Sequence, residues 1–357
     1  MFILFIILFL VLIALLSGYS YYHITQMLPT HRHVKKIAIG IVILLYVLMW
    51  IHRLFMGFFL NACIVFIIFD VISLLVYRFK TVRKYWLKVY QKGFTVLGVS
   101  ILLSLYGIYN VQNIEITTYT ISLSKEMEDK TVVMATDMHI STAVGKEELD
   151  TFVEETKRVD PDMIFLVGDI YDESSKDKDI EYSYTIFEEL TKEYPVYFVS
   201  GNHEVGQGAG GVLESKNIKA KLKDIGIQVL DDETIELEDM YLIGRQDATI
   251  TKRKSLDKIV NGLKEDKAKI VLDHQPTDYE NSKKLKMDLV VSGHTHGGQL
   301  FPVGLFDSLL KVNDLNYGYI EEGDFNAVVS SGMGTWGFAM RTSRQCEIVI
   351  LNIQGEK

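Results

Sequence analysis

Five short apolar runs in the second half of the chain each end at side chains of the kind that bind metal ions. The runs are rich in Val, Ile, Leu and Phe, the composition of buried strands. They cover Thr131 to Thr136, Met163 to Val167, Val196 to Ser200, Ile270 to Leu272 and Leu289 to Ser292. Open sheets place their sites at the carboxyl ends of strands, because the loops there can vary while the strands hold them rigidly. The pattern therefore predicts one shared site at a sheet edge.

The side chains at those strand ends form five motifs in a fixed order. They are Asp137-Met138-His139, Gly168-Asp169-Ile170-Tyr171-Asp172, Gly201-Asn202-His203-Glu204, Asp273-His274-Gln275-Pro276 and Gly293-His294-Thr295-His296. Imidazole nitrogens with carboxylate or amide oxygens suit Mn, Fe, Zn or Co, whereas a structural zinc site normally recruits the thiolates that these motifs lack. Two divalent cations would clamp the attacking and leaving oxygens of a displacement and acidify a water. They need a carboxylate between them, and Asp169 is the natural bridge.

This set of motifs resembles the pattern of the calcineurin-like metallophosphoesterases, which is D-x-H, G-D-x-x-D, G-N-H-[DE], a lone His and G-H-x-H. The resemblance covers roughly residues 130 to 355. It implies an α/β fold of two packed mixed sheets flanked by helices, and a metal-dependent phosphoric ester hydrolase with two divalent ions. The first metal would be held by Asp137, His139, Asp169 and His296. The second would be held by Asp169, Asn202, His274 and His294.

The same resemblance implies that His203 is a catalytic residue that faces the scissile phosphate, where it stabilises charge or protonates the leaving oxygen. Asp172 would orient this ring, because a carboxylate behind an imidazole fixes its tautomer and raises its basicity. The residues alone also allow Asp172 as a helix cap or solvated acid, and His203 as a further ligand. Glu173 and Glu204 are left out of the site because such acids are more often solvated.

Glu173 also bears on the substrate class. Phosphoprotein phosphatases of this family carry an Arg at that position, which grips the phosphate. An acid there repels a phosphate dianion, and it either tolerates a diester or is turned away into solvent. The sequence around Gly293 to Gln299, with Gly332 to Gly334 and Arg341, resembles a membrane-associated bacterial branch similar to UDP-2,3-diacylglucosamine hydrolases. Arg341 itself either binds substrate or forms a structural ion pair.

The first third of the chain contains nearly uncharged apolar stretches. They are Phe2 to Tyr22, Ile37 to Ile51, Leu54 to Tyr77 and Phe94 to Tyr109. A membrane-spanning helix needs about 20 such residues, so we expect an all-α region of four transmembrane helices in residues 1–112, followed by the catalytic domain in residues 113–357. No basic segment precedes the first stretch, which favours an anchor over a cleaved signal peptide.

Basic residues indicate the orientation of these spans. Arg32, Lys35 and Lys36 lie between the first two spans, and Arg78, Lys80, Arg83, Lys84, Lys88 and Lys92 lie between the last two. The positive-inside tendency makes both loops cytoplasmic, so an even number of spans leaves the catalytic domain outside a cell membrane. Asp70, the single acidic residue of the spans, either meets a partner or cavity or snorkels to the interface.

Charge separates the two parts of the chain. Residues 1–114 hold 10 of the 37 basic residues and one of the 46 acidic residues, which leaves 27 basic against 45 acidic residues and a net charge of −18 in the remainder. A field of this sign argues against nucleic-acid binding, which requires a basic footprint. No obligate protein partner is evident. The expected partners are the bilayer and a phosphoester, which anchoring at the bilayer surface suggests is lipid-linked.

The remaining segments give a coarse secondary structure. Helices are expected at Lys146 to Arg158, Ile180 to Lys192, Val212 to Lys223 and Ser255 to Lys264. A small strand group is expected at Ile227 to Leu230, Thr234 to Leu237 and Met240 to Ile243. Asn110 to Ser124 is expected as a linker or an edge strand, and Gly206 to Gly211 as a mobile loop.

Three functions from different classes fit these observations. The first is a membrane-anchored phosphoesterase that hydrolyses a phosphomonoester, phosphodiester or diphosphate, with manganese among the candidate ions. The second is a catalytically silent metal-binding sensor or scaffold, and the presence of every expected ligand argues against it. The third is a transporter regulated by the soluble domain, but Asp70 alone is little evidence of a transport pathway. We favour the first.

Overall fold

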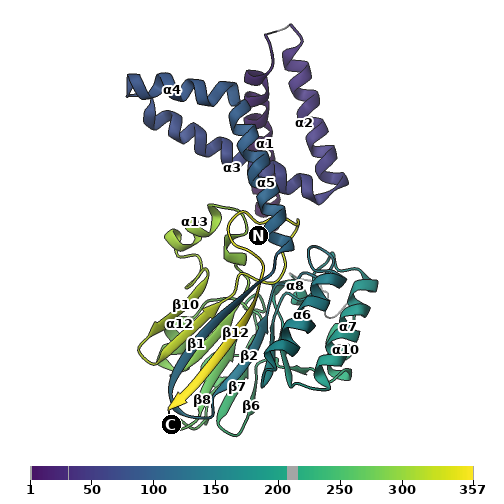
Figure 1. The fold of residues 1–357 in the computed structure, drawn as a ribbon, viewed down its shortest axis with the longest axis vertical. Coiled ribbons are helices and arrows are strands. Elements are labelled where there is room, and N and C mark those ends of the chain that lie inside the picture. Colours follow the sequence, from purple (N-terminus) through teal and green to yellow (C-terminus); the bar gives the residue numbers. More distant parts are fainter. Residues whose placement is uncertain (1, 31, 207–215, 357) are drawn as a thin grey trace. The chain divides into compact units, whose positions relative to one another are not determined.

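The computed structural model describes residues 2–30, 32–206 and 216–356. Its contacts divide the chain into two compact units, Met1–Ile108 and Tyr109–Lys357 (Figure 1). This division falls inside a helix that begins at Phe94 and ends at Gln112. The expected boundary between residues 112 and 113, with its assignment of functions to the two sides, stays a prediction.

The first unit is helical. Its elements are α1 (Phe2–Met27), α2 (Val34–Ile51), α3 (Arg53–Val76), α4 (Lys80–Tyr90), η1 (Gln91–Gly93) and α5 (Phe94–Gln112), the last of which continues into the second unit. In the described part of the chain, α2, α3 and α5 are long and apolar enough to cross a membrane. The expected count of four spans is therefore not exact: Phe2 to Tyr22 lies in helix α1, and a crossing by α1 stays a prediction.

The backbone separates α2 from α3 at His52, which is extended with φ −148° and ψ 122° and accepts a hydrogen bond from the Leu54 amide. The expected break at this point is confirmed. The basic loop that follows α3 contains a helix, α4, that the sequence did not predict. No side chain of α4 is buried, so its helical form leaves the basic residues open to solvent or to lipid head groups.

Asp70 in α3 has polar partners. Its carboxylate accepts hydrogen bonds from the hydroxyls of Tyr19 at 2.7 Å and Tyr90 at 2.9 Å, and it lies 3.0 Å from Nε2 of His23. A charged group in an apolar region is stabilised by such partners. Of the two alternatives for Asp70, the structure therefore shows the one with a partner.

The second unit contains two six-stranded sheets (Figure 1). The first has the order β1 (Glu115–Glu126), β12 (Glu347–Glu356), β2 (Lys130–Ala135), β3 (Met163–Val167), β4 (Val196–Val199) and β5 (Gln228–Val229). The second has the order β10 (Gly318–Glu322), β11 (Phe325–Val329), β9 (Leu289–Ser292), β8 (Ala268–Leu272), β7 (Met240–Gly244) and β6 (Glu233–Glu236). Both are mixed sheets, as predicted.

Within each sheet, the central strands run parallel. In the first sheet β2, β3, β4 and β5 are parallel, and β12 is antiparallel to β2. In the second sheet β7, β8, β9 and β11 are parallel. The segment expected as a linker or an edge strand forms β1, at the edge of the first sheet. The expected small strand group is split, because β5 joins the first sheet while β6 and β7 belong to the second.

One core lies between the two sheets and draws side chains from both, among them Phe165 of β3, Leu242 of β7 and Val291 of β9. Strands β3 and β8 are buried along their whole length. Parallel strands covered on both faces are expected to be continuously apolar, which is why the five runs showed no alternation.

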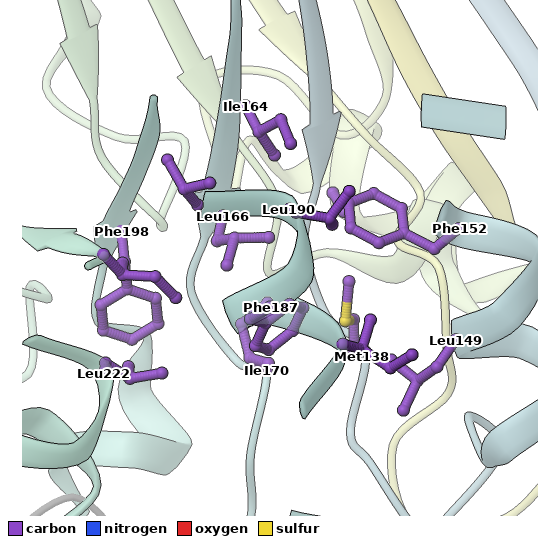
Figure 2. Packing of buried hydrophobic residues seen from close by; sticks show 14 of the residues in the cluster. Met138, Leu149, Phe152, Ile164, Leu166, Ile170, Phe187, Leu190, Phe198 and Leu222 are labelled. Atoms are coloured by element: carbon purple, nitrogen blue, oxygen red, sulfur yellow. The ribbon is translucent and has the colours of Figure 1, made fainter. Parts of the chain in front are cut away.

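Helices cover the outer faces of the sheets. The first sheet packs against α6 (Lys146–Val159), α7 (Asp177–Thr191) and α10 (Ile218–Asp224). Figure 2 shows Phe152, Leu190 and Leu222 from these helices, which belong to the same buried cluster as Phe198 and Leu166 of the sheet. The second sheet packs against the shorter helices α11 (Leu256–Ile259) and α12 (Tyr279–Lys284).

The helices expected in the second unit agree in part with those of the structure. The helix over Lys146 to Arg158 matches α6, and that over Ile180 to Lys192 matches α7 with an earlier start. The helix over Ser255 to Lys264 is shorter than expected and ends at Ile259. The expected helix from Val212 begins outside the described residues, and its described part is α10. Of the expected mobile loop from Gly206 to Gly211, Gly206 alone is among the described residues.

Candidate metal centre

The predicted ligands meet at the carboxyl ends of the parallel strands. Among the described residues, two groups of three have ligand atoms within 4.8 Å of one another. These groups are Asp137, His139 and His296, and Asp169, His274 and His294. The first group combines loops after β2 and β9, and the second combines loops after β3, β8 and β9. The site therefore joins the two sheets, which no single run of sequence reveals.

Asn202, the seventh predicted ligand, extends the second group. It begins the short helix α8 (Asn202–Val205) after β4, and its Oδ1 lies 2.8 Å from Nδ1 of His294. The backbone amide of His203 in the same turn donates to Oδ1 of Asp169 at 2.9 Å. The turn after β4 is thus attached to the carboxylate expected to bridge the metals.

A hydrogen bond to the backbone sets the tautomer of His274. Nδ1 of His274 lies 2.8 Å from the carbonyl oxygen of Val167, which only accepts, so Nδ1 carries the proton. Nε2 of His274 then presents a lone pair toward Oδ2 of Asp169 at 3.1 Å. A carbonyl behind an imidazole is the usual arrangement at a metal ligand, because it leaves the other nitrogen free to bind.

The donor set fits metal ions. Nε2 of His139 lies 3.2 Å from Nε2 of His296, and Oδ1 of Asp137 lies 3.4 Å from the same atom of His296. Among the described residues, Oδ1 of Asp137 and Nε2 of His274 are buried without a hydrogen-bond partner. Buried acceptors that face one another without donors are costly. Cations between them remove this cost, so the residues present suit two divalent ions.

The carboxylates outweigh burial at His274 and His139 and raise the pKa of each, whereas burial lowers the pKa of His294 and His296. Burial alone would lower the pKa of His274. The opposing effect of Asp169 and Asp137 is larger, so the pKa lies well above its usual value. Burial likewise raises the pKa of Asp169, and the neighbouring His274 and His139 reverse that effect and hold it low. The ionised Asp169 thus attracts a positive charge at Nε2 of His274, either a proton or a metal ion.

Strained backbone positions the ligands. Positive φ values, which are uncommon outside glycine, occur at Asp137 (50°), His139 (44°), Asp169 (52°), His294 (71°) and His296 (51°). Each such conformation costs on the order of 1–3 kcal/mol and tends to persist at functional sites, where the surrounding structure enforces it. The chain turns sharply at the strand ends, and this turn aims the side chains at one point.

Glycines of the motifs allow close approach. A Cβ at Gly168, where φ is 77°, would lie 2.6 Å from Nδ1 of His274, and one at Gly201 would lie 2.6 Å from the Asp169 backbone nitrogen. Real Cβ atoms do not come so close, so these positions exclude a side chain.

Glu204 is buried, contrary to the expectation that it is solvated. Its carboxylate accepts hydrogen bonds from the backbone amides of Asp169 (2.8 Å), Tyr171 (2.9 Å) and Gly201 (2.7 Å). Burial, with the Asp169 charge, raises its pKa to about 7. This side chain ties the loop after β3 to the loop after β4. The acid in G-N-H-[DE] was the sequence signal that could have identified it.

Asp172 contacts a different histidine from the one expected, and Glu173, although exposed as expected, takes the place beside His203. Oδ2 of Asp172 lies 3.1 Å from Nδ1 of His139, whereas His203 has its Nδ1 3.1 Å from Oε2 of Glu173. The expected pairing of Asp172 with His203 is thus not found. The loop turns inward at Asp172, which is buried, and the next side chain points to solvent beside His203. The His203 ring lies 5.1 Å from that of His139, measured between centroids.

Among the described residues, Arg341 has hydrogen bonds to backbone carbonyls rather than the expected ion pair, and substrate binding by this side chain stays a prediction. It is fully buried and donates to the backbone carbonyls of His296, Ser331, Gly332 and Gly334. Its guanidinium therefore holds the loop of His296 against the segment after β11.

Two residues near the site form contacts that the sequence did not predict. Asp273, the first residue of the fourth motif, does not join the ligand groups but accepts from Arg245 at 3.0 Å and from Arg253 at 3.1 Å. Trp336, which is 52% exposed, places its ring 5.5 Å from that of His203. Such contacts depend on loops far apart in the chain, so no local pattern could predict them.

Comparisons with known proteins agree with this geometry. The calcineurin-like phosphoesterase family matches residues 130–298. An uncharacterized metallophosphoesterase of Campylobacter jejuni is 31% identical over 264 residues, covering 72% of this chain and 69% of that protein. One from Helicobacter pylori is 31% identical over 244 residues, covering 67% and 63%. A Bos taurus protein named transmembrane protein with metallophosphoesterase domain is 28% identical over 278 residues, covering 72% and 61%.

A cluster of Asp, Asn and His side chains at the carboxyl edge of two mixed sheets defines a metal-dependent phosphoester hydrolase. The chain belongs to the calcineurin-like phosphoesterase family. The prediction of family, fold and enzyme class is confirmed. The apolar helices and the transmembrane relative support a membrane protein.

Proposed function

We propose that this chain is a multi-pass membrane enzyme that hydrolyses a lipid-linked phosphoester at the bilayer surface with two divalent metal ions. The supporting observation is the short connection between α5 and the catalytic fold. Helix α5, long and apolar enough to span a membrane, ends at Gln112, and β1 begins at Glu115. Two residues tether the metal centre to the membrane, so substrates confined to that membrane have a high effective concentration.

The metals are assigned to the side chains that converge at the sheet edge. The first ion is assigned to Asp137, His139, Asp169 and His296. The second is assigned to Asp169, Asn202, His274 and His294. When bound, the ions supply an acidified water and polarise the phosphoryl oxygens. Oxygen and imidazole donors accept Mn, Fe, Zn or Co, and manganese is the first ion to test.

His203 is proposed to contact the substrate phosphate. An ionised carboxylate only accepts hydrogen bonds, so Nδ1 of His203 donates to Glu173, and Nε2 points away from that carboxylate. Glu173 then orients the ring, the part first given to Asp172. Asp172 instead orients His139 and is a positioning residue for a ligand.

The charge around His203 favours phosphoesters with one negative charge per phosphorus. Glu173 is 65% exposed and stands beside the proposed phosphate-contacting ring, where it repels a dianionic monoester more strongly than a monoanionic diester. A phosphodiester or a bridged diphosphate fits this environment. The resemblance to UDP-2,3-diacylglucosamine hydrolases supports the same class, an amphipathic diphosphate.

The catalytic domain is proposed to be extracytoplasmic. Helix α4 carries Lys80, Arg83, Lys84 and Lys88 and is separated from α5 only by the short η1. Basic segments are retained on the cytoplasmic side. A single crossing by α5 then places the metal centre on the other side. This argument does not depend on whether α1 crosses.

The test is hydrolysis of chromogenic phosphomonoesters and phosphodiesters by the full-length protein in detergent with Mn²⁺. An Asp169→Ala variant is the control for adventitious activity, and metal content is measured on both proteins. Diester turnover that disappears with the substitution supports the proposal. Two bound metal equivalents without turnover of either ester, or of a phospholipid-derived diester, would favour the silent sensor.

A further inference from the structure

The second unit exposes an apolar helix close to the metal centre. Helix α13 (Val303–Leu310) has no buried residue. With its neighbours it forms what we call the apolar face, composed of Phe301, Leu305, Phe306, Leu309, Leu310 and Trp336, each between 52% and 73% exposed. Single exposed apolar residues are ordinary, whereas a contiguous group of this size marks a surface that meets a partner or a membrane.

The polar side of α13 is fixed to the protein. Asp307 accepts hydrogen bonds from the side-chain amides of Asn313 at 3.0 Å and Asn316 at 2.6 Å. At the start of the helix the backbones of Gly298 and Gly304 approach so closely that a Cβ on Gly298 would collide with Gly304. The outward direction of the apolar side chains is therefore set by the fold.

The apolar face begins at the metal centre. Four residues separate the predicted ligand His296 from Phe301 along the chain. Gln299 between them accepts from the Trp336 amide at 3.2 Å and donates to the Trp336 carbonyl at 3.1 Å. Because the Trp336 ring lies against His203, one end of the face adjoins the residue proposed to contact phosphate.

Its other neighbour is the end of the membrane-length helix. Asn110, in the last turn of α5 and within the second unit, is buried and donates to the Arg341 carbonyl at 3.1 Å. The next residue, Thr342, accepts from the Phe301 amide at 3.0 Å. Two hydrogen bonds and one peptide link thus connect the end of α5 to the first residue of the face. The apolar medium nearest to that helix end is the bilayer.

Charge identifies the kind of contact. Residues 301–312 contain one acidic residue, the hydrogen-bonded Asp307, and one basic residue, Lys311, whereas the rest of this unit is strongly acidic. An acidic domain is repelled by anionic lipid head groups. The attraction must then come from apolar burial, to which Phe and Trp at a membrane interface are suited.

We propose that the apolar face inserts into the lipid surface of the bilayer and presents the metal centre to phosphoesters in that leaflet. The consequence for catalysis rests on the proposed function, whereas the insertion itself does not. The occupant is the acyl region of the bilayer. Insertion persists in neutral phosphatidylcholine and at high salt, because apolar burial carries it.

The experiment places an environment-sensitive fluorophore on Leu309→Cys in the full-length chain, reconstituted into phosphatidylcholine vesicles. Some of the lipids carry a nitroxide on the acyl chain. A matched label on Glu238→Cys, exposed in the turn between β6 and β7, is the control. The native Cys63 and Cys346 are buried, and the unsubstituted chain measures their labelling. The label at residue 309 is expected to shift to the blue and to be quenched by the lipid nitroxide, whereas aqueous iodide quenches only the control.

Equal iodide quenching at residues 309 and 238 would overturn the proposal. So would a label at residue 309 that is shielded from iodide and also from the lipid nitroxide, since a second copy of the chain would then cover the face. None of these readings uses catalysis, so they stand even if the proposed function fails.

A paired change tests the consequence. Leu309→Asp with Leu310→Asp should leave hydrolysis of a soluble chromogenic ester unchanged and lower hydrolysis of a vesicle-borne phosphoester about tenfold or more, because two leucines lose their apolar burial. If the double substitution changed the hydrolysis rate of both substrates by the same factor, the face would not guide the enzyme to lipid.

Discussion

Oδ2 of Asp172 lies 3.1 Å from Nδ1 of His139. This carboxylate fixes the ring so that Nε2 points toward His296, and outer partners of this kind strengthen a metal site by about 10–100-fold. We expect Asp172→Ala to weaken binding of one metal equivalent by about that factor. Titration of the metal-free protein with Mn²⁺, read by calorimetry, measures the change.

Glu173→Gln is the matched control for that experiment. Glu173 is adjacent to Asp172 in sequence but contacts His203 rather than a predicted ligand. The metal affinity of the Glu173→Gln variant should therefore equal that of the unmodified chain. If both substitutions weakened metal binding alike, the contact between Asp172 and His139 would not be the cause.

Glu173→Gln should also change substrate preference. Removing this charge is expected to raise kcat/KM for a dianionic monoester relative to a diester by about two- to fivefold, because exposed charge pairs contribute only about 0.2–1 kcal/mol. The comparison uses two chromogenic esters with the same leaving group. A ratio that does not change would mean that Glu173 does not face the substrate phosphate.

Some of the fold and site could be predicted from sequence because the signal was local. The strands around Phe165 and Val291 are continuous apolar runs, and their ligands follow directly. Glu204 was missed because a buried acid that binds backbone amides resembles any loop acid in sequence. The partner of Asp172 was missed because two successive side chains of one loop point in opposite directions, and which of them turns inward depends on packing.

Longer-range features had no such signal. β5 joined the first sheet although its neighbours in sequence joined the second, since strand pairing is decided by tertiary packing. The role of Arg341 follows from four carbonyls on two segments that are distant in sequence, the loop of His296 and residues 331–334. The sequence did not predict helix α4, because the basic residues in that segment were explained by the positive-inside tendency, which holds whether or not the segment is helical.

Close packing at the metal centre makes a specific demand on Gly168. Gly168→Ala should abolish binding of at least one metal, because the new Cβ would lie 2.6 Å from His274 Nδ1. Gly323→Ala is the control: Gly323 also has positive φ, at 67°, but nothing lies within 4 Å of its Cβ position. Both variants carry a backbone cost of about 1 kcal/mol, and only the first has the clash. Equal metal content in the two purified variants would contradict the steric explanation.

The membrane topology can be tested with single cysteines on the two sides of α5. Lys88 in α4 is exposed, and Glu238 is exposed in the second unit. If α5 crosses the membrane once from a cytoplasmic basic segment, a membrane-impermeant maleimide added to intact cells should label Glu238→Cys and not Lys88→Cys. Permeabilised cells should show labelling at both positions, which controls for reactivity. Labelling of Lys88→Cys alone in intact cells would place the metal centre in the cytoplasm, because the basic residues of α4 would then lie outside.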